Sequence, residues 1–205
     1  MRTDVLLIFG AGGHGRVVAD AARAAGATGL LASDRNPALC QGELLPGVPL
    51  HRPDAPAPAQ ATALHVAIGQ NTSRERESQA LGPQRLHTVC HPAASVSPFA
   101  QLGAGSFVAA QAVVAPGARL GLGVIVNHGA VVDHDCAVGA FAHIAPGAVL
   151  GGGVHIGTRV LVGAGAVVLP GLTVVADAVI GLGAIVCQNI DTQGTYVGVP
   201  ARKIS

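Results

Sequence analysis

From Val96 onward the chain repeats every six residues without a break, and no other feature constrains its fold as strongly. Sixteen successive hexads, from Val96 to the one that starts at Val186, each begin with Val, Leu or Ile. The fifth residue of nearly every hexad is small or aliphatic, as in Ala130 and Cys136, and glycine dominates the second and fourth positions. This period is typical of a parallel β-helix, in which three hexads complete a triangular coil.

The composition agrees with a closely stacked backbone rather than an aromatic-centred core. Half of the 205 residues are hydrophobic, yet there is no Trp and one Tyr, against 29 Gly. Residues 136–157 carry no charged side chain and are long enough to span a bilayer, but their glycines and six-residue period argue against a membrane helix. Because few charged residues lie in the hexads, we expect identical subunits to cover much of the solenoid.

Charge and cysteine usage limit the partners and the compartment. The formal net charge is +1, which gives no reason to expect binding to nucleic acid or to a membrane. The four cysteines are scattered, without the spacing of a zinc site, so we expect no metal. Reduced cysteines and the lack of a signal peptide favour a cytoplasmic protein.

The first ninety residues predict a small parallel α/β sheet. Short apolar runs alternate with helical segments, which is the pattern of such a sheet. The expected strands are 5–9, 29–32, 64–68 and 86–89, the expected helices are 16–25 and 74–81, and 45–61 reads as loop. We therefore predict a half-Rossmann-like domain over residues 1–91 and a β-helix domain over residues 92–205.

A glycine loop follows the first expected strand and precedes the first helix. Gly10-x-Gly12-x-x-Gly15 fits a dinucleotide fingerprint, and Asp34 lies where an acid would bind a ribose. A tight strand–helix turn without a ligand would give the same pattern. Only one βαβ half precedes the hexads, so the loop suits the diphosphate of a mononucleotide, such as a nucleotide-linked sugar, better than NAD.

An acid–His–acid cluster, Asp133-His134-Asp135, interrupts the apolar hexads. A carboxylate bound to one imidazole nitrogen leaves the other as a general base and stabilises the imidazolium. Strict strand alternation would point His134 away from both acids, but a hexad corner bends the chain. The sequence leaves open which Asp reaches the ring. His128 and His155 read as solvated corner residues.

Five segments together carry a resemblance that spans essentially the whole chain. They are the unbroken hexads, Gly10-Ala-Gly-Gly-His-Gly15, Ala67-Ile-Gly-Gln-Asn71, Val131-Val-Asp-His-Asp-Cys136 and Val197-Gly-Val-Pro-Ala-Arg202. In these the chain resembles the bacterial hexapeptide-repeat sugar acyltransferases, of the sialic acid O-acetyltransferase type. That family includes the N-acetyltransferases for UDP-4-amino sugars and for GDP-perosamine.

The resemblance implies a left-handed β-helix, a homotrimer, acetyl-CoA bound between adjacent β-helices and direct acetyl transfer to a sugar nucleotide. By position, His134 is the base and Asp135 the carboxylate that orients it. His143 matches a histidine near the acetyl thioester, where it could donate to the carbonyl oxygen, and Asn127 lies in a polar slot upstream. The other implied binding residues are Gly12, Gly13 and His14 for the diphosphate and Asp34 and Gly69 for the nucleoside. CoA also carries phosphate charges, and the basic residues after the last coil, Arg202 and Lys203, could either bind them or form a solvated tail.

The expected activity is therefore acetyl-CoA-dependent N-acetylation of a nucleotide-linked 4-amino-4,6-dideoxy sugar. A sugar O-acetyltransferase and a non-catalytic sugar-nucleotide-binding scaffold remain alternatives, and a nicotinamide-dependent enzyme is a third. The sequence leaves open which sugar, which nucleotide and which acyl chain length are used. His128, where relatives often have Thr, marks a departure from the family pattern.

Overall fold

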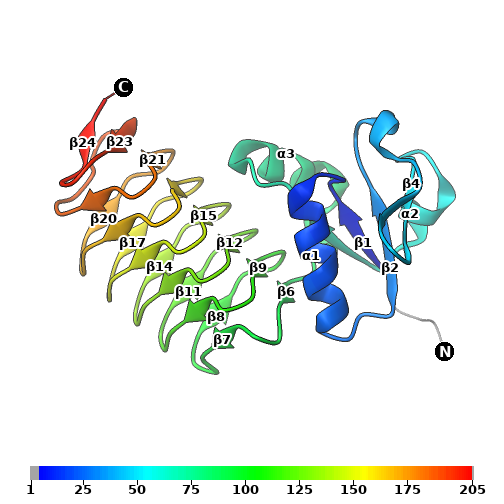
Figure 1. Cartoon of the computed structure of the whole chain (residues 1–205), viewed down its shortest axis with the longest axis horizontal. Helices are drawn as coiled ribbons and strands as arrows, with labels where there is room; N and C mark the ends of the chain where they lie inside the picture. Colours follow the sequence, from blue (N-terminus) through cyan, green and yellow to red (C-terminus); the bar gives the residue numbers. More distant parts are fainter. Residues whose placement is uncertain (1–4, 205) are drawn as a thin grey trace.

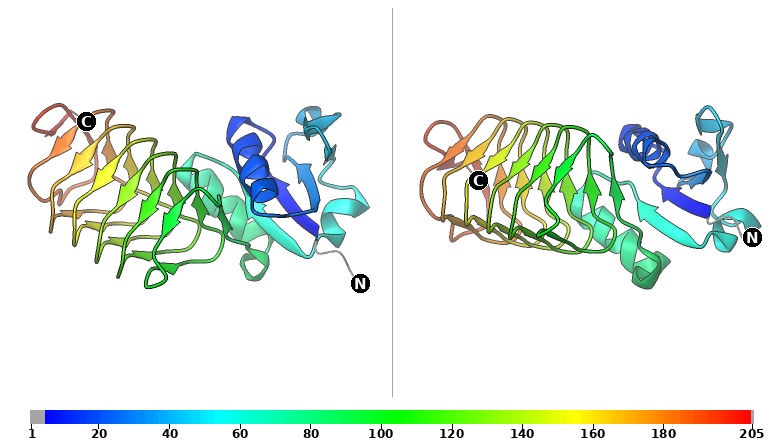
Figure 2. Two further views of the ribbon diagram at one scale, coloured as in Figure 1. Left: turned by 60° about the horizontal axis from the view of Figure 1, so that its bottom comes forward. Right: turned by 90° about the horizontal axis from the view of Figure 1, so that it is seen from below.

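A computed structural model describes residues 5–204 and shows an α/β domain at one end of an elongated β-helix (Figure 1). The chain leaves the α/β domain at β6 and winds away from it, so the C-terminus lies at the far end of the solenoid. Two further views show the stacked coils edge-on (Figure 2). Within the described residues, no helix is long and apolar enough to cross a membrane.

The N-terminal sheet has the order β3-β4-β2-β1-β5. β1 pairs in parallel with both β2 and β5, β2 pairs in parallel with β4, and β3 is antiparallel to β4. The strands are β1 Val5–Phe9, β2 Gly29–Ser33, β3 Glu43–Leu45, β4 Val48–His51 and β5 Ala63–Val66. The helices are α1 Gly13–Ala24, α2 Pro56–Gln60 and α3 Asn71–Leu81, with 3₁₀ turns η1 Pro37–Leu39 and η2 Pro83–Arg85.

Two of the expectations for this domain were wrong. Residues 45–61, expected to be loop, contain β4 and α2. These elements were not predicted because Pro49 in β4 and the prolines of α2 are residues with low strand and helix propensity. The expected fourth strand at 86–89 does not join the sheet as a strand. Leu86 forms only an isolated parallel bridge with Leu64, and Val89 belongs to β6, which pairs with β9 of the solenoid.

Three sheets form the faces of the solenoid, and their strands are parallel except for the last, β24, which is antiparallel to β23. Along the coils, strands in one sheet repeat every eighteen residues, as in Val113↔Val131↔Val149. One face consists of β7 Ser95–Val96, β10 Val113–Val114, β13 Val131–Val132, β16 Val149–Leu150, β19 Val167–Val168 and β22 Ile185–Val186. The second consists of β8 Gln101–Leu102, β11 Arg119–Leu120, β14 Ala137–Val138, β17 His155–Ile156 and β20 Thr173–Val174. The third consists of β6 Val89–Cys90, β9 Phe107–Val108, β12 Ile125–Val126, β15 His143–Ile144, β18 Leu161–Val162, β21 Val179–Ile180, β23 Thr195–Val197 and β24 Arg202–Lys203.

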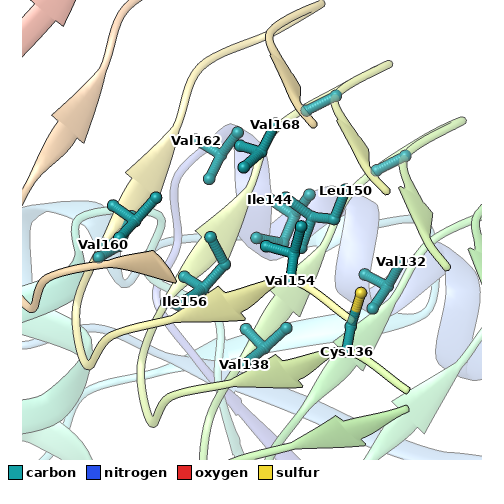
Figure 3. Close-up of a cluster of buried hydrophobic side chains, with 14 of the residues drawn as sticks. Val132, Cys136, Val138, Ile144, Leu150, Val154, Ile156, Val160, Val162 and Val168 are labelled. Atoms are coloured by element: carbon teal, nitrogen blue, oxygen red, sulfur yellow. The ribbon is translucent and has the colours of Figure 1, made fainter. Parts of the chain in front are cut away.

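The hexad starts form the core of the solenoid, as the repeat predicts. From Val108 to Val186 every start is buried, and the small fifth residues such as Ala130 and Cys136 fill the space between them (Figure 3). The predicted fold class, a half-Rossmann-like α/β domain followed by a left-handed parallel β-helix, is confirmed.

The α/β domain packs against the outward side of the third face. Phe107 and Ile125 point outward from β9 and β12, yet both are buried, because they join a core cluster with Ile8 of β1 and Val18 of α1. His143 follows Ile125 in the same outward column. It therefore lies at the junction of the two domains. β6 precedes the predicted domain boundary at residue 91 but forms the first rung of this face.

Candidate active site

A cleft of about 440 Å³ lies at the carboxyl ends of β1 and β5. β1 has β2 on one side and β5 on the other, and ligands of open parallel sheets bind where the connections diverge in this way. All five residues predicted to bind the substrate line it: Gly12, Gly13, His14, Asp34 and Gly69. The structure thus brings this predicted group together, although its binding role stays a prediction.

The four glycines of the first loop divide into two kinds. A Cβ on Gly10 would lie 2.6 Å from the carbonyl oxygen of Ala67, and a Cβ on Gly15 would overlap the carbonyl of Gly10. These two glycines are required by packing. Gly12 and Gly13 have open space where a Cβ would point, so their side of the loop is free to approach a ligand closely.

Asp34 holds the glycine loop in place. One carboxylate oxygen accepts a hydrogen bond of 2.8 Å from the backbone amide of Ala11, and the other accepts one of 2.9 Å from the amide of Asn36. The expected nucleoside-binding acid is therefore also the residue that fixes the loop before α1.

The rim of the cleft carries charged side chains that the sequence did not single out. Glu77 of α3 is buried and pairs with both Arg35 and Arg76, whose side chains are largely exposed. Burial alone would raise the pKa of Glu77, but its hydrogen bonds with the two arginines hold it below the ordinary value. The adjacency of Arg35 to Asp34 was the only sequence signal for this group.

His14 points from the glycine loop toward the solenoid. Its ring contacts Phe107 edge-on, with centroids 5.3 Å apart, and its centroid is 6.5 Å from that of His143. Burial, followed by the charges of nearby His65 and His143, lowers the pKa of His14 to about 3. Its Nε2 is buried and has no hydrogen-bond partner within residues 5–204. His14 is therefore neutral at physiological pH.

Asn127 and His143 form a pair whose hydrogen-bond roles can be assigned. The side-chain oxygen of Asn127 accepts from the backbone amide of His128 at 2.9 Å, which places its NH₂ group 3.1 Å from Nε2 of His143. Nε2 therefore accepts, and the imidazole proton is on Nδ1. Burial, together with the charge of Arg74, lowers the pKa of His143 to about 4, so the ring is neutral. The free donor of this pair is the amide of Asn127 rather than the imidazole.

Arg74 of α3 joins the two domains and was missed by the sequence analysis. Its buried guanidinium donates to the carbonyl of Ile68 at 2.8 Å in the α/β domain, and to the carbonyls of Gly123 at 2.8 Å and Phe141 at 2.6 Å in the solenoid. Asn71 adds a bond of 2.8 Å to the carbonyl of Arg159. No periodicity marks Arg74, because its partners come from separate parts of the chain.

His134 and Asp135 form a hydrogen-bonded pair at a corner of the solenoid. Nδ1 of His134 lies 2.9 Å from a carboxylate oxygen of Asp135, while Asp133 accepts instead from the backbone amide of His134 at 2.7 Å. This settles which Asp reaches the ring. The hydrogen bond with Asp135, followed by the charge of Asp133, raises the pKa of His134. The side chain of His134 is 62% exposed, so the ring is largely open to solvent.

The other predicted site residues are not brought together within one chain. No hydrogen bond joins the His134–Asp135 pair to the Asn127–His143 pair among residues 5–204. Arg202 and Lys203 are exposed in β24, at the end of the solenoid farthest from the α/β domain (Figure 1). In the same described part of the chain, no group of three or more His, Cys, Asp or Glu side chains is placed to hold a metal ion.

Comparisons with known proteins agree with the fold. Residues 5–81 match the family described as the PglD N-terminal domain. A comparison with curated proteins gives no significant match.

Solved structures match over nearly the whole chain. A histidine-to-alanine mutant of GDP-perosamine N-acetyltransferase from Caulobacter crescentus, in complex with CoA and GDP-perosamine, is 35% identical, with 98% of this chain and 97% of that chain covered and a TM-score of 0.91. The acetyltransferase domain of PglB from Neisseria gonorrhoeae FA1090 is 38% identical, with 98% and 100% covered and a TM-score of 0.90. The same domain in complex with acetyl coenzyme A gives a TM-score of 0.88.

A hexapeptide-repeat β-helix joined to a small α/β domain is the architecture shared with the matched acetyltransferases, so the chain is an acyltransferase. The matches narrow the class to enzymes that acylate sugars. This chain belongs to the hexapeptide-repeat sugar acyltransferase family, and within it the chain is a sugar N-acetyltransferase.

Proposed function

We propose that the protein transfers the acetyl group of acetyl-CoA to the amino group of a nucleotide-linked 4-amino-4,6-dideoxy sugar. The observation that carries this proposal is the 2.9 Å hydrogen bond between Nδ1 of His134 and Asp135, which leaves Nε2 of a largely exposed side chain to act as a general base. The matched structures that contain CoA with GDP-perosamine, or acetyl coenzyme A, support both substrates.

In the proposed reaction the sugar amine attacks the thioester carbonyl directly. A C–N bond forms as Nε2 of His134 takes the proton from the amine. The tetrahedral intermediate then collapses with cleavage of the C–S bond, and the proton passes to the CoA thiolate. Asp135 stabilises the imidazolium formed between these steps. General base catalysis of this kind contributes about 10²–10⁴-fold to the rate, and the thioester needs no further activation.

The nucleotide part of the substrate is proposed to occupy the cleft of the α/β domain. Gly12 and Gly13 present an open backbone for the diphosphate at the N-terminus of α1, where the helix dipole favours negative charge. His14 is the third residue of this proposed diphosphate-binding loop. Asp34 and Gly69 flank the nucleoside on the two sides of the cleft.

The acetyl-CoA site is proposed to lie between adjacent β-helices of a homotrimer. In it the amide of Asn127, held by His143, donates to the acetyl carbonyl, and Arg202 and Lys203 contact the phosphates of CoA. In this proposal residues 1–91 bind the sugar nucleotide, residues 92–205 carry the transfer chemistry, and the enzyme works in the cytoplasm.

The test is release of the CoA thiol from acetyl-CoA in the presence of UDP-, GDP- and dTDP-linked 4-amino sugars and of free sialic acid. We expect one amino sugar to support turnover, and His134→Ala to lower kcat by about 10²-fold or more while KM changes little. A circular dichroism spectrum identical to that of the wild type controls for folding.

Two results would contradict the proposed reaction. Turnover with sialic acid alone would identify an O-acetyltransferase. Binding of a sugar nucleotide without turnover of any acceptor would identify a binding scaffold. Separately, equal rates for the wild type and His134→Ala would show that His134 is not the general base, while the acceptor identified in the panel would stand.

A further inference from the structure

Gly152 occupies a position of the hexad where the repeat does not need glycine. It is the only glycine among the third residues of the sixteen hexads, five of which are alanine. The residues one coil before and one coil after Gly152 are His134 and Pro170. Its backbone is outside the left-handed region, so an alanine is compatible with its conformation.

An alanine at position 152 would collide with the imidazole of His134. The atom nearest to a Cβ on Gly152 would be Nε2 of that ring, followed by Cε1 at 2.6 Å and Cδ2 at 3.0 Å. Other glycines of the solenoid differ, because a Cβ on Gly157 would meet the backbone of Ala176 in the next coil. At Gly152 all three nearest atoms belong to the side chain of His134.

The preceding coil also has a glycine beside the His134–Asp135 pair. A Cβ on Gly117 would overlap a carboxylate oxygen of Asp135, although Gly117 also has a φ of +75° and is favoured by its corner. The His134–Asp135 pair therefore lies between two glycines, Gly117 in the preceding coil and Gly152 in the following one. Only the second is free of a backbone requirement.

We propose that Gly152 is a positioning residue for the acetyl transfer, because the missing Cβ lets the imidazole of His134 lie across the next coil with Nδ1 on Asp135. An added methyl group would force the ring to turn about its side-chain bonds and would break the 2.9 Å contact. The importance of this position for catalysis rests on the proposed role of His134 as the base.

The variant Gly152→Ala tests this inference. We expect kcat to fall by about 10²-fold, the scale of a misplaced catalytic group, with KM for both substrates within about twofold of the wild type. We also expect the pKa of His134, followed by NMR of its ring protons, to fall toward its ordinary value, because Asp133 and Asp135 are the charged groups that raise it. An unchanged pKa together with an unchanged kcat would overturn the proposal.

The double variant His134→Ala, Gly152→Ala separates positioning from a general effect on the coil. With the imidazole gone, the alanine at 152 should leave kcat at the level of His134→Ala and should keep or raise Tm, because glycine-to-alanine changes at compatible sites reduce the entropy of the unfolded chain. A Tm of the double variant below that of His134→Ala would mean that the fold of the coil itself requires glycine at position 152, and would overturn the proposal. If Gly152→Ala lowers the pKa of His134 but leaves kcat unchanged, the positioning stands and the proposed base is wrong.

Discussion

Within residues 5–204, Asp135 is one of five non-glycine residues with a positive φ, and all five occupy the fourth position of a hexad. A left-handed conformation costs such a residue about 1–2 kcal/mol, although Asp tolerates it better than most. At Asp135 this conformation turns the carboxylate back toward the preceding side chain, so it reaches His134 despite the alternation of a strand. The corner thus makes a contact between sequence neighbours that a straight strand forbids.

We expect Asp135→Asn to lower kcat by about tenfold or more and to move the acid limb of the pH–rate profile to lower pH. The carboxylate raises the pKa of His134, and the base is active only when unprotonated. Removing the negative charge therefore lets the ring lose its proton at lower pH, while making it a weaker base. A pH series of kcat/KM checks this result.

Asp133→Asn is the matched control for that experiment. Its side chain can still accept from the backbone amide of His134, and only its charge is lost, so we expect a smaller shift in the same direction. An acid limb that does not move in Asp135→Asn would show that the pair does not set the protonation of the base.

At the scale of elements, the loop between β1 and α1 combines two demands in six residues. Gly10 and Gly15 allow α1 to approach the end of the sheet, whereas Gly12 and Gly13 leave the ligand side of the loop bare. Asp34, at the end of β2, fastens this loop through the amide of Ala11. The fingerprint of the sequence thus contains a packing component and a binding component at different positions.

The two components can be separated by alanine substitution. Gly12→Ala should leave stability unchanged and raise KM for the sugar nucleotide by about tenfold, equivalent to ~1.4 kcal/mol, because the methyl group would enter the open side of the loop. Gly15→Ala should instead destabilise the protein by about 1–3 kcal/mol, because its Cβ would overlap the carbonyl of Gly10. Urea denaturation and initial-rate kinetics measure both effects. Equal loss of stability in the two variants would contradict this division.

At the scale of the whole molecule, the placement of the α/β domain on the solenoid depends on buried polar contacts as well as on apolar packing. The guanidinium of Arg74 is buried among carbonyl oxygens from both domains and has no carboxylate partner among the described residues. Burial lowers its pKa to about 9. Around it, Arg159 bridges Asp177 of the next coil and Glu75 of α3. These contacts fix the cleft relative to the face that carries His143.

We expect Arg74→Met to lower the free energy of unfolding by several kcal/mol, because each buried carbonyl left without a donor costs about 1–3 kcal/mol. Chemical denaturation followed by circular dichroism measures this loss. Gln79→Met, on the exposed side of the same helix, should change stability by less than about 0.5 kcal/mol. Equal effects of the two substitutions would show that the hydrogen bonds from Arg74 to the buried carbonyls do not stabilise the junction of the two domains.

The sequence predicted the parts of this molecule that depend on local periodicity. The hexads identified the solenoid and its inward residues, and the glycine loop located the cleft. The family resemblance pointed to Asp135 as the partner of His134, but the spacing alone left Asp133 and Asp135 open, because the contact depends on the backbone angles of one corner. The contacts of Arg74 and Glu77 could not be predicted, because their partners come together only when the domains pack. β4 was missed because its central Pro49 is tolerated only where a backbone donor is not needed.

The eighteen-residue period also restricts how the length of this chain can change. An insertion or deletion of one residue among the coils would send every later aliphatic side chain outward, and one of six would move every later residue to a different face. Only a change of eighteen preserves the faces, and it shifts every later coil by one rung, about 4.8 Å along the axis. Phe141, at the corner bound by Arg74, lies one hexad after Asp135. Changes of chain length can therefore alter the angle between the corner of Asp135 and the corner of Phe141 only in discrete steps, and smaller changes of geometry require substitutions.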